Sequence, residues 1–325
     1  MNSAQRVKFS FRRGRRRWGF SRRHIIVPRR MRFGTRGNQD ATASSITYYE
    51  PMHAPRPLHV WPVLASSGPL EVRIAETPLE IEAAQRLRYR VFYEEMTAIP
   101  TPQMRAQKRD FDRFDAFCDH ILVVDRDVAD ENGDSAVVGT YRLLRGEVAA
   151  LQGGYYTSSE YDLTSMLHAN PPGTRFVELG RSCVLKSYRS KAITMQLLWK
   201  GVMAYVAHYS IDVMFGCGSL PGTDPDTLAL QLSYLHHYHR APEGARVRAR
   251  PELYVEMNRM PVDAIDPKEA MRKLPPLIKG YVRAGTYIGD GAVVDRQFGT
   301  TDVLIYFPVS KIDPRFKSRF GDRTN

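Results

Sequence analysis

The chain has 325 residues, of which 43% are hydrophobic and 25% charged, a composition typical of a soluble globular protein with one large or two modest domains. Three scattered cysteines argue against a disulfide framework or a zinc site and favour a reducing compartment. The most apolar stretch, Ile193–Phe215, has polar interruptions that exclude a membrane span. The formal net charge of +12 resides in residues 1–40, which hold 13 of the 47 basic residues and one of the 35 acidic ones, and this removes most of the case for a nucleic-acid-binding fold.

Residues 1–69 are predicted to be a disordered basic arm followed by a Pro-rich linker from residue 41. Runs such as Arg12–Arg17 repel one another and offer little surface to bury. Three interpretations stay open: peripheral contact with anionic lipid at the inner face of the membrane, nonspecific nucleic-acid binding, and an extension without function. The predicted location is cytoplasmic, with or without peripheral contact at the inner face of the membrane.

Residues 70–320 are predicted to form the folded domain, which begins with a strand over Leu70–Ala75. Thr77 to Glu80 read as a capping box with Pro at the first helical position, and apolar residues at helical spacing continue to Phe92. Two β-rich runs, His120–Asp125 and Ala136–Arg145, flank an Asn-Gly turn and predict a hairpin.

The second half of the domain alternates strands and helices. Their order predicts an α/β (α+β) fold with a mixed central sheet flanked by helices, antiparallel pairs first and a parallel βαβ crossover in the middle. The predicted elements are a short helix over Ser159–His168, strand Arg175–Leu185, helix Ser190–Tyr209, strand Ile211–Leu220, a helix from Asp224 to His237, a helix from Lys268 that Pro275-Pro276 kinks or restarts, and a last strand, Asp302–Val309.

The crossover carries the polar residues of most chemical interest. Glu178 and Arg181 interrupt an apolar strand, and three cations, Lys186, Arg189 and Lys191, surround the start of the next helix. A helix N-terminus with cations beside it suits a phosphate or pyrophosphate. Cations solvated on a surface loop explain these residues equally well.

A second constellation is the acidic run that contains Asp110, Asp112, Asp115 and Asp119. Carboxylates this close need cations, and the candidates are Arg88, Arg90, Arg142 and Arg181; a solvated loop is the alternative. A metal is not expected, because the run lacks the Gly and terminal Glu of a calcium loop.

Four motifs resemble the acyl-homoserine-lactone synthases: Leu87–Phe92, Asp112–Asp115, Gly139–Arg142 and Glu178–Arg181. The resemblance implies a GNAT-type acyl-CoA N-acyltransferase fold with acyl carrier protein as donor.

The sequence resembles still more closely the ornithine N-acyltransferases of ornithine-lipid synthesis, and this resemblance covers residues 70–320. It rests on Cys118–Val123, Glu178–Val184, Leu274–Tyr281 and Asp313–Phe316. Two departures weigh against the lactone synthases: there is no Trp between Phe92 and Asp112, and the chain continues well beyond residue 240.

The resemblance implies transfer of a (3-hydroxy)fatty acyl group from the 4'-phosphopantetheine thioester of acyl carrier protein to the α-amine of L-ornithine, giving lyso-ornithine lipid, with no bound cofactor or metal. Aminolysis needs a neutral amine, and Glu178 is the candidate base. Backbone N–H groups near Ser182–Val184 are candidates to polarise the carbonyl.

Binding roles are assigned to the remaining polar residues. Arg189 and Lys191 are expected to hold the pantetheine phosphate. Arg142 and Arg181 are expected to orient the acidic run or to grip the ornithine carboxylate. Further predicted substrate-binding residues are Arg88, Asp112 and Asp115, the two aspartates facing the ammonium groups, and Met195, Leu198 and Met203 are candidate walls for the acyl chain.

Two other functions stay open. One is an acyl-homoserine-lactone synthase, whose acceptor would be S-adenosylmethionine. The other is non-enzymatic binding of anionic membrane or nucleic acid through the arm, although no specific nucleic-acid partner is expected. Cys183 as a nucleophile and the histidines of His236–His239 as metal ligands are less favoured than a small buried residue and a polar helix end.

Overall fold

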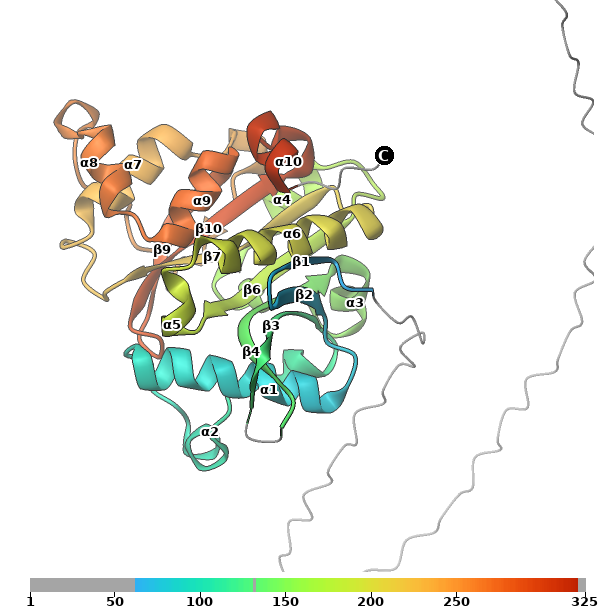
Figure 1. The fold of residues 1–325 in the computed structure, drawn as a ribbon. Coiled ribbons are helices and arrows are strands. Elements are labelled where there is room, and N and C mark those ends of the chain that lie inside the picture. Colours follow the sequence, from blue (N-terminus) through green and yellow to red (C-terminus); the bar gives the residue numbers. More distant parts are fainter. Residues whose placement is uncertain (1–61, 131–132, 321–325) are drawn as a thin grey trace, which may run out of the picture. The chain divides into compact units, whose positions relative to one another are not determined.

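The computed structural model describes residues 62–130 and 133–320 (Figure 1), so the predicted arm and most of the predicted linker lie outside the described part. The described residues form a ten-stranded sheet in the order β1-β2-β3-β4-β6-β7-β10-β9-β8-β5. The strands are β1 (Ala65–Ser67), β2 (Leu70–Ile74), β3 (Asp119–Ala129), β4 (Ser135–Arg145), β5 (Tyr161–Asp162), β6 (Phe176–Val184), β7 (Val213–Pro221), β8 (Arg248–Ala249), β9 (Tyr287–Asp295) and β10 (Thr300–Pro308).

Helices cover both faces of this sheet. They are α1 (Pro78–Tyr89), α2 (Pro102–Gln107), α3 (Gly146–Leu151), α4 (Thr164–Ala169), α5 (Lys186–Arg189), α6 (Ala192–His208), α7 (Ala229–His239), α8 (Pro267–Lys273), α9 (Pro276–Ala284) and α10 (Pro314–Phe320). Short 3₁₀ turns link them, and a π-helical segment, η1 (Arg90–Glu95), extends α1. No helix in the described part of the chain is both long and apolar enough to cross a membrane.

Helix α1 begins at the predicted capping box. The Thr77 hydroxyl accepts a hydrogen bond from the Glu80 amide at 3.3 Å, and the Glu80 carboxylate accepts one from the Thr77 amide at 3.0 Å. The two bonds satisfy amides that have no partner within the helix. The predicted restart at Pro275-Pro276 is also confirmed, because α8 ends at Lys273 and α9 begins at Pro276.

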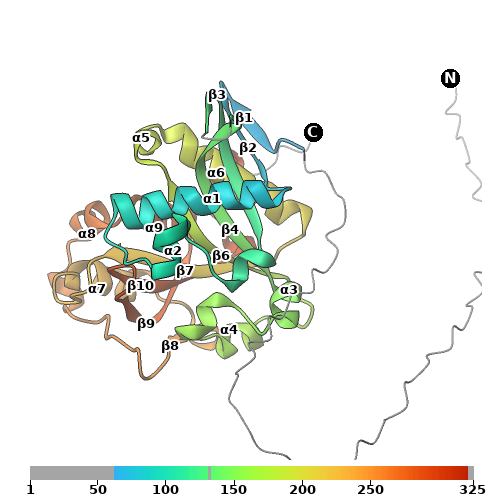
Figure 2. The same cartoon turned by 90° about the horizontal axis from the view of Figure 1, so that it is seen from below.

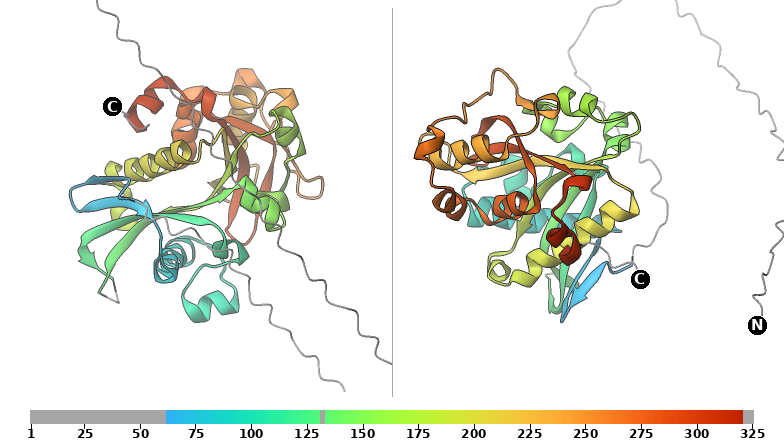
Figure 3. Two further views of the ribbon diagram at one scale, coloured as in Figure 1. Left: turned by 90° about the vertical axis from the view of Figure 1, so that its right-hand side faces the viewer. Right: turned by 90° about the horizontal axis from the view of Figure 1, so that it is seen from above.

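Strand β3 shows how the first half of the sheet packs on both sides. Successive side chains of a strand point to opposite faces. Ile121 and Val123 join the large core cluster that includes α6, whereas Leu122 and Val124 pack with Ala84 of α1. Helices α1 and α6 therefore lie on opposite faces of this part of the sheet (Figure 2 and Figure 3, left).

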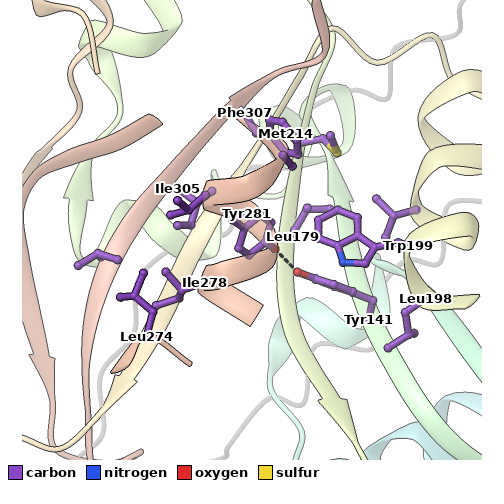
Figure 4. Close-up of a cluster of buried hydrophobic side chains, with 14 of the residues drawn as sticks. Tyr141, Leu179, Leu198, Trp199, Met214, Leu274, Ile278, Tyr281, Ile305 and Phe307 are labelled. Atoms are coloured by element: carbon purple, nitrogen blue, oxygen red, sulfur yellow. Dashed lines mark hydrogen bonds between the residues drawn. The ribbon is translucent and has the colours of Figure 1, made fainter. Parts of the chain in front are cut away.

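The large cluster joins α6 and α9 across the middle of the sheet (Figure 4). Trp199 of α6 meets the Tyr281 ring of α9 edge to face, with ring centroids 5.3 Å apart. The Tyr281 hydroxyl is hydrogen-bonded to the hydroxyl of Tyr141 on β4. This contact ties the late helix α9 to the strand beside β6.

Strands β6 and β7 form the predicted parallel crossover, but they pair over only three residues. Phe176, Val177 and Glu178 lie opposite Val213, Met214 and Phe215, after which the strands separate. Gly216 stands where the separation begins, with φ of +156°, and a Cβ on it would lie 2.2 Å from the Leu179 carbonyl oxygen. Only a residue without a side chain allows this approach.

Two parts of the sequence fold differently from the prediction. Strand β9 was not predicted, because Gly289 and Gly291 interrupt its apolar residues; Gly291 has φ of +82° at an irregular part of the strand. The single helix predicted over Ser159–His168 is wrong: Tyr161 belongs to strand β5, and Asp162 accepts a hydrogen bond from the Thr164 amide that starts α4 one turn later. In addition, β1 lies within the stretch predicted as linker and pairs with β2.

Three arginines and three aspartates form a buried ion-pair network beneath α1. Arg88, fully buried, donates to Asp110 at 2.8 Å and to Asp115 at 2.7 Å. Arg142 donates to Asp115 at 3.1 Å, and its second aspartate is Asp112, 2.7 Å away. The third arginine, Arg181, lies 3.3 Å from both Asp110 and Asp112.

The network is neutral overall, and its charges are strongly coupled. Burial by itself would raise the pKa of Asp110 and Asp115, but the arginines outweigh it and hold both pKa values below the ordinary range. Burial, reinforced by Arg88, lowers the pKa of neighbouring His120 to about 3, so this imidazole is neutral. Removing one arginine would leave three buried or half-buried carboxylates with only two cations.

The close approach at Gly216 predicts that Gly216→Ala lowers the free energy of unfolding by about 2 kcal/mol or more, because the new methyl group overlaps the Leu179 carbonyl. Urea unfolding measures this. Gly244→Ala is the matched control: no atom lies within 4 Å of its Cβ position, and we expect a change under about 1 kcal/mol. Equal effects of the two substitutions would refute the packing argument.

The ion-pair network predicts that Arg88→Met lowers the free energy of unfolding by about 3–5 kcal/mol, because Asp110 and Asp115 each lose one of their two arginine partners and the network is left with an excess negative charge. Arg109→Met, which breaks a solvent-facing pair with Glu82, is the control and should cost less than about 1 kcal/mol. The account fails if the buried substitution is no more costly than the surface one.

Candidate active site

A cavity of about 450 Å³ lies where β6 and β7 separate. Strands β4, β6, β7 and β10 contribute to its lining, together with η1, the start of α6 and the start of α9. The sequence analysis assigned catalytic or binding roles to eight charged residues. Five of these eight line the cavity: Arg142, Glu178, Arg181, Arg189 and Lys191. The crossover therefore brings together the predicted base, the predicted phosphate ligands and two predicted substrate ligands.

Glu178 stands at the vertex of the separation, on the last residue of β6 that pairs with β7. Its side chain is buried, and its two oxygens accept hydrogen bonds from the amides of Tyr156 at 2.9 Å and Thr157 at 2.6 Å. Burial raises the pKa of Glu178, although these two amides partly oppose the shift. The amides fix the carboxylate in place, and its raised basicity suits a proton acceptor.

Arg142 and Arg181 reach the cavity from β4 and from a strained position on β6. Arg181 has φ of +51°, a conformation that costs energy for a residue with a side chain, and the β4–β6 register shifts beside it. The strained backbone places its guanidinium between two rings, 4.7 Å from the Tyr156 centroid and 4.8 Å from that of Phe298. Such strain is typical of functional positions.

Arg88, Asp112 and Asp115 are not among the residues that line the cavity. They lie behind it in the network, where the aspartates bind Arg142 and Arg181. Of the two roles predicted for Arg142 and Arg181, orienting the acidic run is visible in these contacts. Direct contact of Arg88, Asp112 and Asp115 with substrate stays a prediction.

The cavity is cationic at the start of α6. Arg189 donates to the Val184 carbonyl at 2.8 Å and forms an ion pair with Glu95 of η1. Lys191 lies 4.4 Å from the centroid of the Tyr188 ring. The N-terminus of the 17-residue helix α6 has no side-chain cap, although the Thr194 amide donates to the Lys191 carbonyl at 3.1 Å. The positive end of this helix favours an anion.

At β7 and β10 the cavity is acidic, and sequence reasoning missed this feature. Oxygen atoms of Glu160 and Asp302 and the sulfur of Cys217 lie within 4.8 Å of one another. Burial, with the charge of Asp302 beside it, raises the pKa of Glu160 to about 7, and burial, with the charge of Asp295, raises the pKa of Asp302 to about 6. The one available signal was Asp302, a carboxylate within the apolar strand that was predicted last in the chain.

Apolar and aromatic residues complete the lining, including Phe92, Met96, Tyr156, Met195 and Phe298. Met195 was a predicted wall for the acyl chain. The other two candidates, Leu198 and Met203, are buried in the core cluster instead. Burial raises the pKa of the Cys183 thiol to about 12, which disfavours it as a nucleophile.

A second cavity of about 810 Å³ lies beside α3 and α4, where Glu147, Tyr155 and His208 are among its lining residues. None of the eight residues singled out in the sequence lines this second cavity. The separation of β6 and β7 is therefore the better candidate for the active site.

Comparison with known proteins identifies the fold and the family of the chain. A family model described as an acetyltransferase (GNAT) domain matches residues 87–200, which span α1 to α6 and include Glu178. The chain therefore has the GNAT fold that the sequence predicted, with a mixed central sheet flanked by helices. A crystal structure of the acyl-homoserine-lactone synthase LasI aligns with a TM-score of 0.41 and 12% identity, covering 77% of this chain and 94% of that one.

Curated relatives are far more similar. The chain is 52% identical over 259 residues to an L-ornithine N(alpha)-acyltransferase of Rhizobium meliloti, covering 80% of this chain and 86% of the relative. It is 50% identical to an enzyme of the same name from Agrobacterium fabrum, over 78% of this chain and 86% of the relative. The protein is thus an acyltransferase that belongs to the L-ornithine N(alpha)-acyltransferase family.

Proposed function

We propose that the protein transfers a (3-hydroxy)fatty acyl group from the 4'-phosphopantetheine thioester of acyl carrier protein to the α-amine of L-ornithine, giving lyso-ornithine lipid. The observation that carries this proposal is the layout of the cavity. Cations line the cavity at the start of α6, Glu160 and Asp302 line it beside β7, and Glu178 lines it from β6. One end suits a phosphate and the other a cationic amino acid.

The donor's phosphate is assigned to Arg189, Lys191 and the first amides of α6. The three groups act on the same anion: the charge of Lys191, the positive helix end, and Arg189, which shares its charge with Glu95. From there the pantetheine arm would run along β6, whose edge is freed beyond Glu178 by the separation from β7. An extended arm can bind such an edge as an added strand does.

Acyl transfer then needs a neutral amine at the thioester carbonyl. Glu178 takes a proton from the ornithine α-ammonium, directly or through one water, and the amine attacks the carbonyl carbon. The C–N bond forms, the C–S bond breaks, and the pantetheine thiol leaves with a proton. Backbone amides near Ser182–Val184, which line the cavity, are assigned to the oxyanion of the intermediate.

The ornithine carboxylate is assigned to Arg142 and Arg181. Ion pairs with the aspartates engage Nη1 of Arg142 and Nε and Nη2 of Arg181. The remaining N–H groups of the two guanidiniums would donate to the ornithine carboxylate. Arg88, Asp112 and Asp115 then support catalysis by holding these two arginines in place. A bidentate arginine contact fixes the orientation of a carboxylate.

The product is amphiphilic, and this gives the predicted arm a role. We propose that the basic residues among 1–40 hold anionic lipid headgroups and keep the enzyme at the inner face of the membrane.

The proposed reaction predicts thiol release when purified protein is mixed with 3-hydroxyacyl carrier protein and L-ornithine, together with an acyl-ornithine product detected by mass spectrometry. S-adenosylmethionine as acceptor should give no more release than buffer. The free acyl-CoA should be the poorer donor, because it lacks the carrier protein's surface. Thiol release that depends on S-adenosylmethionine would overturn the proposal in favour of a lactone synthase.

The assigned base predicts that Glu178→Gln lowers kcat by about 10²-fold, because the amide cannot take the ammonium proton. In the wild type kcat should rise with pH as Glu178 loses its proton, and the variant should lack this rise. Glu243→Gln, at an exposed position outside the cavity, is the control and should match wild type. A Glu178→Gln enzyme with near-normal turnover would reject the assignment.

A further inference from the structure

We infer that Glu160 and Asp302 form a subsite for the side-chain ammonium of the acceptor, which makes the enzyme selective for diamino acids. The inference rests on the proposed acylation of ornithine and adds the residues that recognise its side chain. Recognition at this point would leave the α-amine, and not the side-chain amine, facing Glu178.

The two carboxylates come from separate parts of the fold. Glu160 ends the 3₁₀ turn Tyr156–Ser159, and Asp302 lies within β10. The Tyr161 hydroxyl donates to the Asp302 carbonyl oxygen at 2.9 Å and so fixes the residue after Glu160 against β10. The carboxylates are therefore held close to each other by the backbone around them.

Asp302 has an unmet hydrogen-bonding capacity that faces the cavity. Its side chain is 7% exposed and lines the cavity, yet its Oδ1 has no hydrogen-bond partner among the described residues. The hydroxyls of Ser219 and Thr300, which line the same cavity, lie near this carboxylate and oppose the rise in its pKa without satisfying Oδ1. Buried polar atoms of this kind are costly unless a ligand or water satisfies them.

The pair also lacks a cation. Neither Glu160 nor Asp302 takes part in an ion pair with a described lysine, arginine or histidine within 4.0 Å, and the influence of Arg181 on both is weakened by its own bonds to Asp110 and Asp112. Two buried acids that repel each other gain most from a bound positive charge.

The subsite is connected to the proposed base through two residues, Thr157 and Cys217. The Thr157 amide donates to Glu178, and the Thr157 hydroxyl lies 3.8 Å from the Cys217 sulfur. Cys217 in turn donates to Glu160 at 3.3 Å. A diamino acid bound here would have one amine at Glu178 and the other at Glu160 and Asp302.

The geometry favours an ammonium over a metal ion. Oxygens within 4.8 Å of each other can both lie within hydrogen-bonding distance of one nitrogen. A calcium or magnesium ion needs about six or more oxygen ligands. Cys217 is a poor third metal ligand, because burial and the two acids raise the pKa of its thiol well above the ordinary value and keep it protonated.

The test compares ornithine with norvaline, which has the same carbon chain without the side-chain amine, in Glu160→Gln and Asp302→Asn. We expect each substitution to lower kcat/KM for ornithine by about 10- to 100-fold, the range for one lost hydrogen bond to a charged group. For norvaline, kcat/KM should change by less than about threefold. Asp263→Asn, exposed and remote from the cavity lining, is the matched control.

Equal losses for both acceptors would overturn the inference, because they indicate a structural role or a proton-transfer role for these acids. A stoichiometric metal ion in the purified wild type that disappears in Asp302→Asn would also overturn it. Wild-type enzyme that acylates norvaline as well as ornithine would refute the subsite and leave the proposed reaction intact. A wild type that acylates neither would refute the proposed function itself.

A second readout uses wild-type protein alone and so does not depend on the folding of the variants. At pH 8, where both acids are ionised, millimolar ornithine should raise the thermal midpoint by more than equal norvaline. Equal shifts for the two ligands would contradict the subsite.

Discussion

The separation of β6 and β7 after three paired residues is the constraint on which the active site depends. It frees the edge of β6 beyond Glu178, opens the cavity, and leaves the start of α6 pointing into that opening. Gly216 permits it, because only a residue without Cβ can approach the Leu179 carbonyl at the vertex. A strained Arg181 follows on β6, so both strands depart from regular geometry at the same level of the sheet.

The ion-pair network has equal numbers of positive and negative charges, whereas each end of the cavity has an excess of one sign. Arg88, Arg142 and Arg181 match three aspartates, so the network positions groups without itself attracting a ligand. At the start of α6 positive charge exceeds negative, and at Glu160 and Asp302 the reverse holds. A phosphate-bearing donor and a cationic acceptor would compensate the two excesses, with Glu178 at the point where they meet.

Much of this could be predicted from local signals. The capping box of α1, the restart at Pro276 and the parallel crossover follow from side-chain periodicity and helix-end chemistry, and polar residues in an apolar strand pointed to Glu178 and Arg181. Strand β9 could not be predicted, since its two glycines interrupt the apolar pattern. They are needed because a Cβ at Gly289 or Gly291 would collide with Leu304 of β10 or with Tyr254, and these contacts exist only in the folded chain. The acidic subsite was equally hidden, because Glu160 and Asp302 are 142 positions apart in sequence and meet only through the tertiary fold.

The most direct test of this account is a crystal structure with a bisubstrate conjugate, in which the α-nitrogen of ornithine is joined through an acyl group to phosphopantetheine. The account predicts the phosphate beside Arg189 and Lys191, the α-nitrogen near Glu178, and the side-chain ammonium between Glu160 and Asp302. A conjugate bound in the cavity beside α3 and α4, or bound between β6 and β7 with its ends reversed, would contradict it.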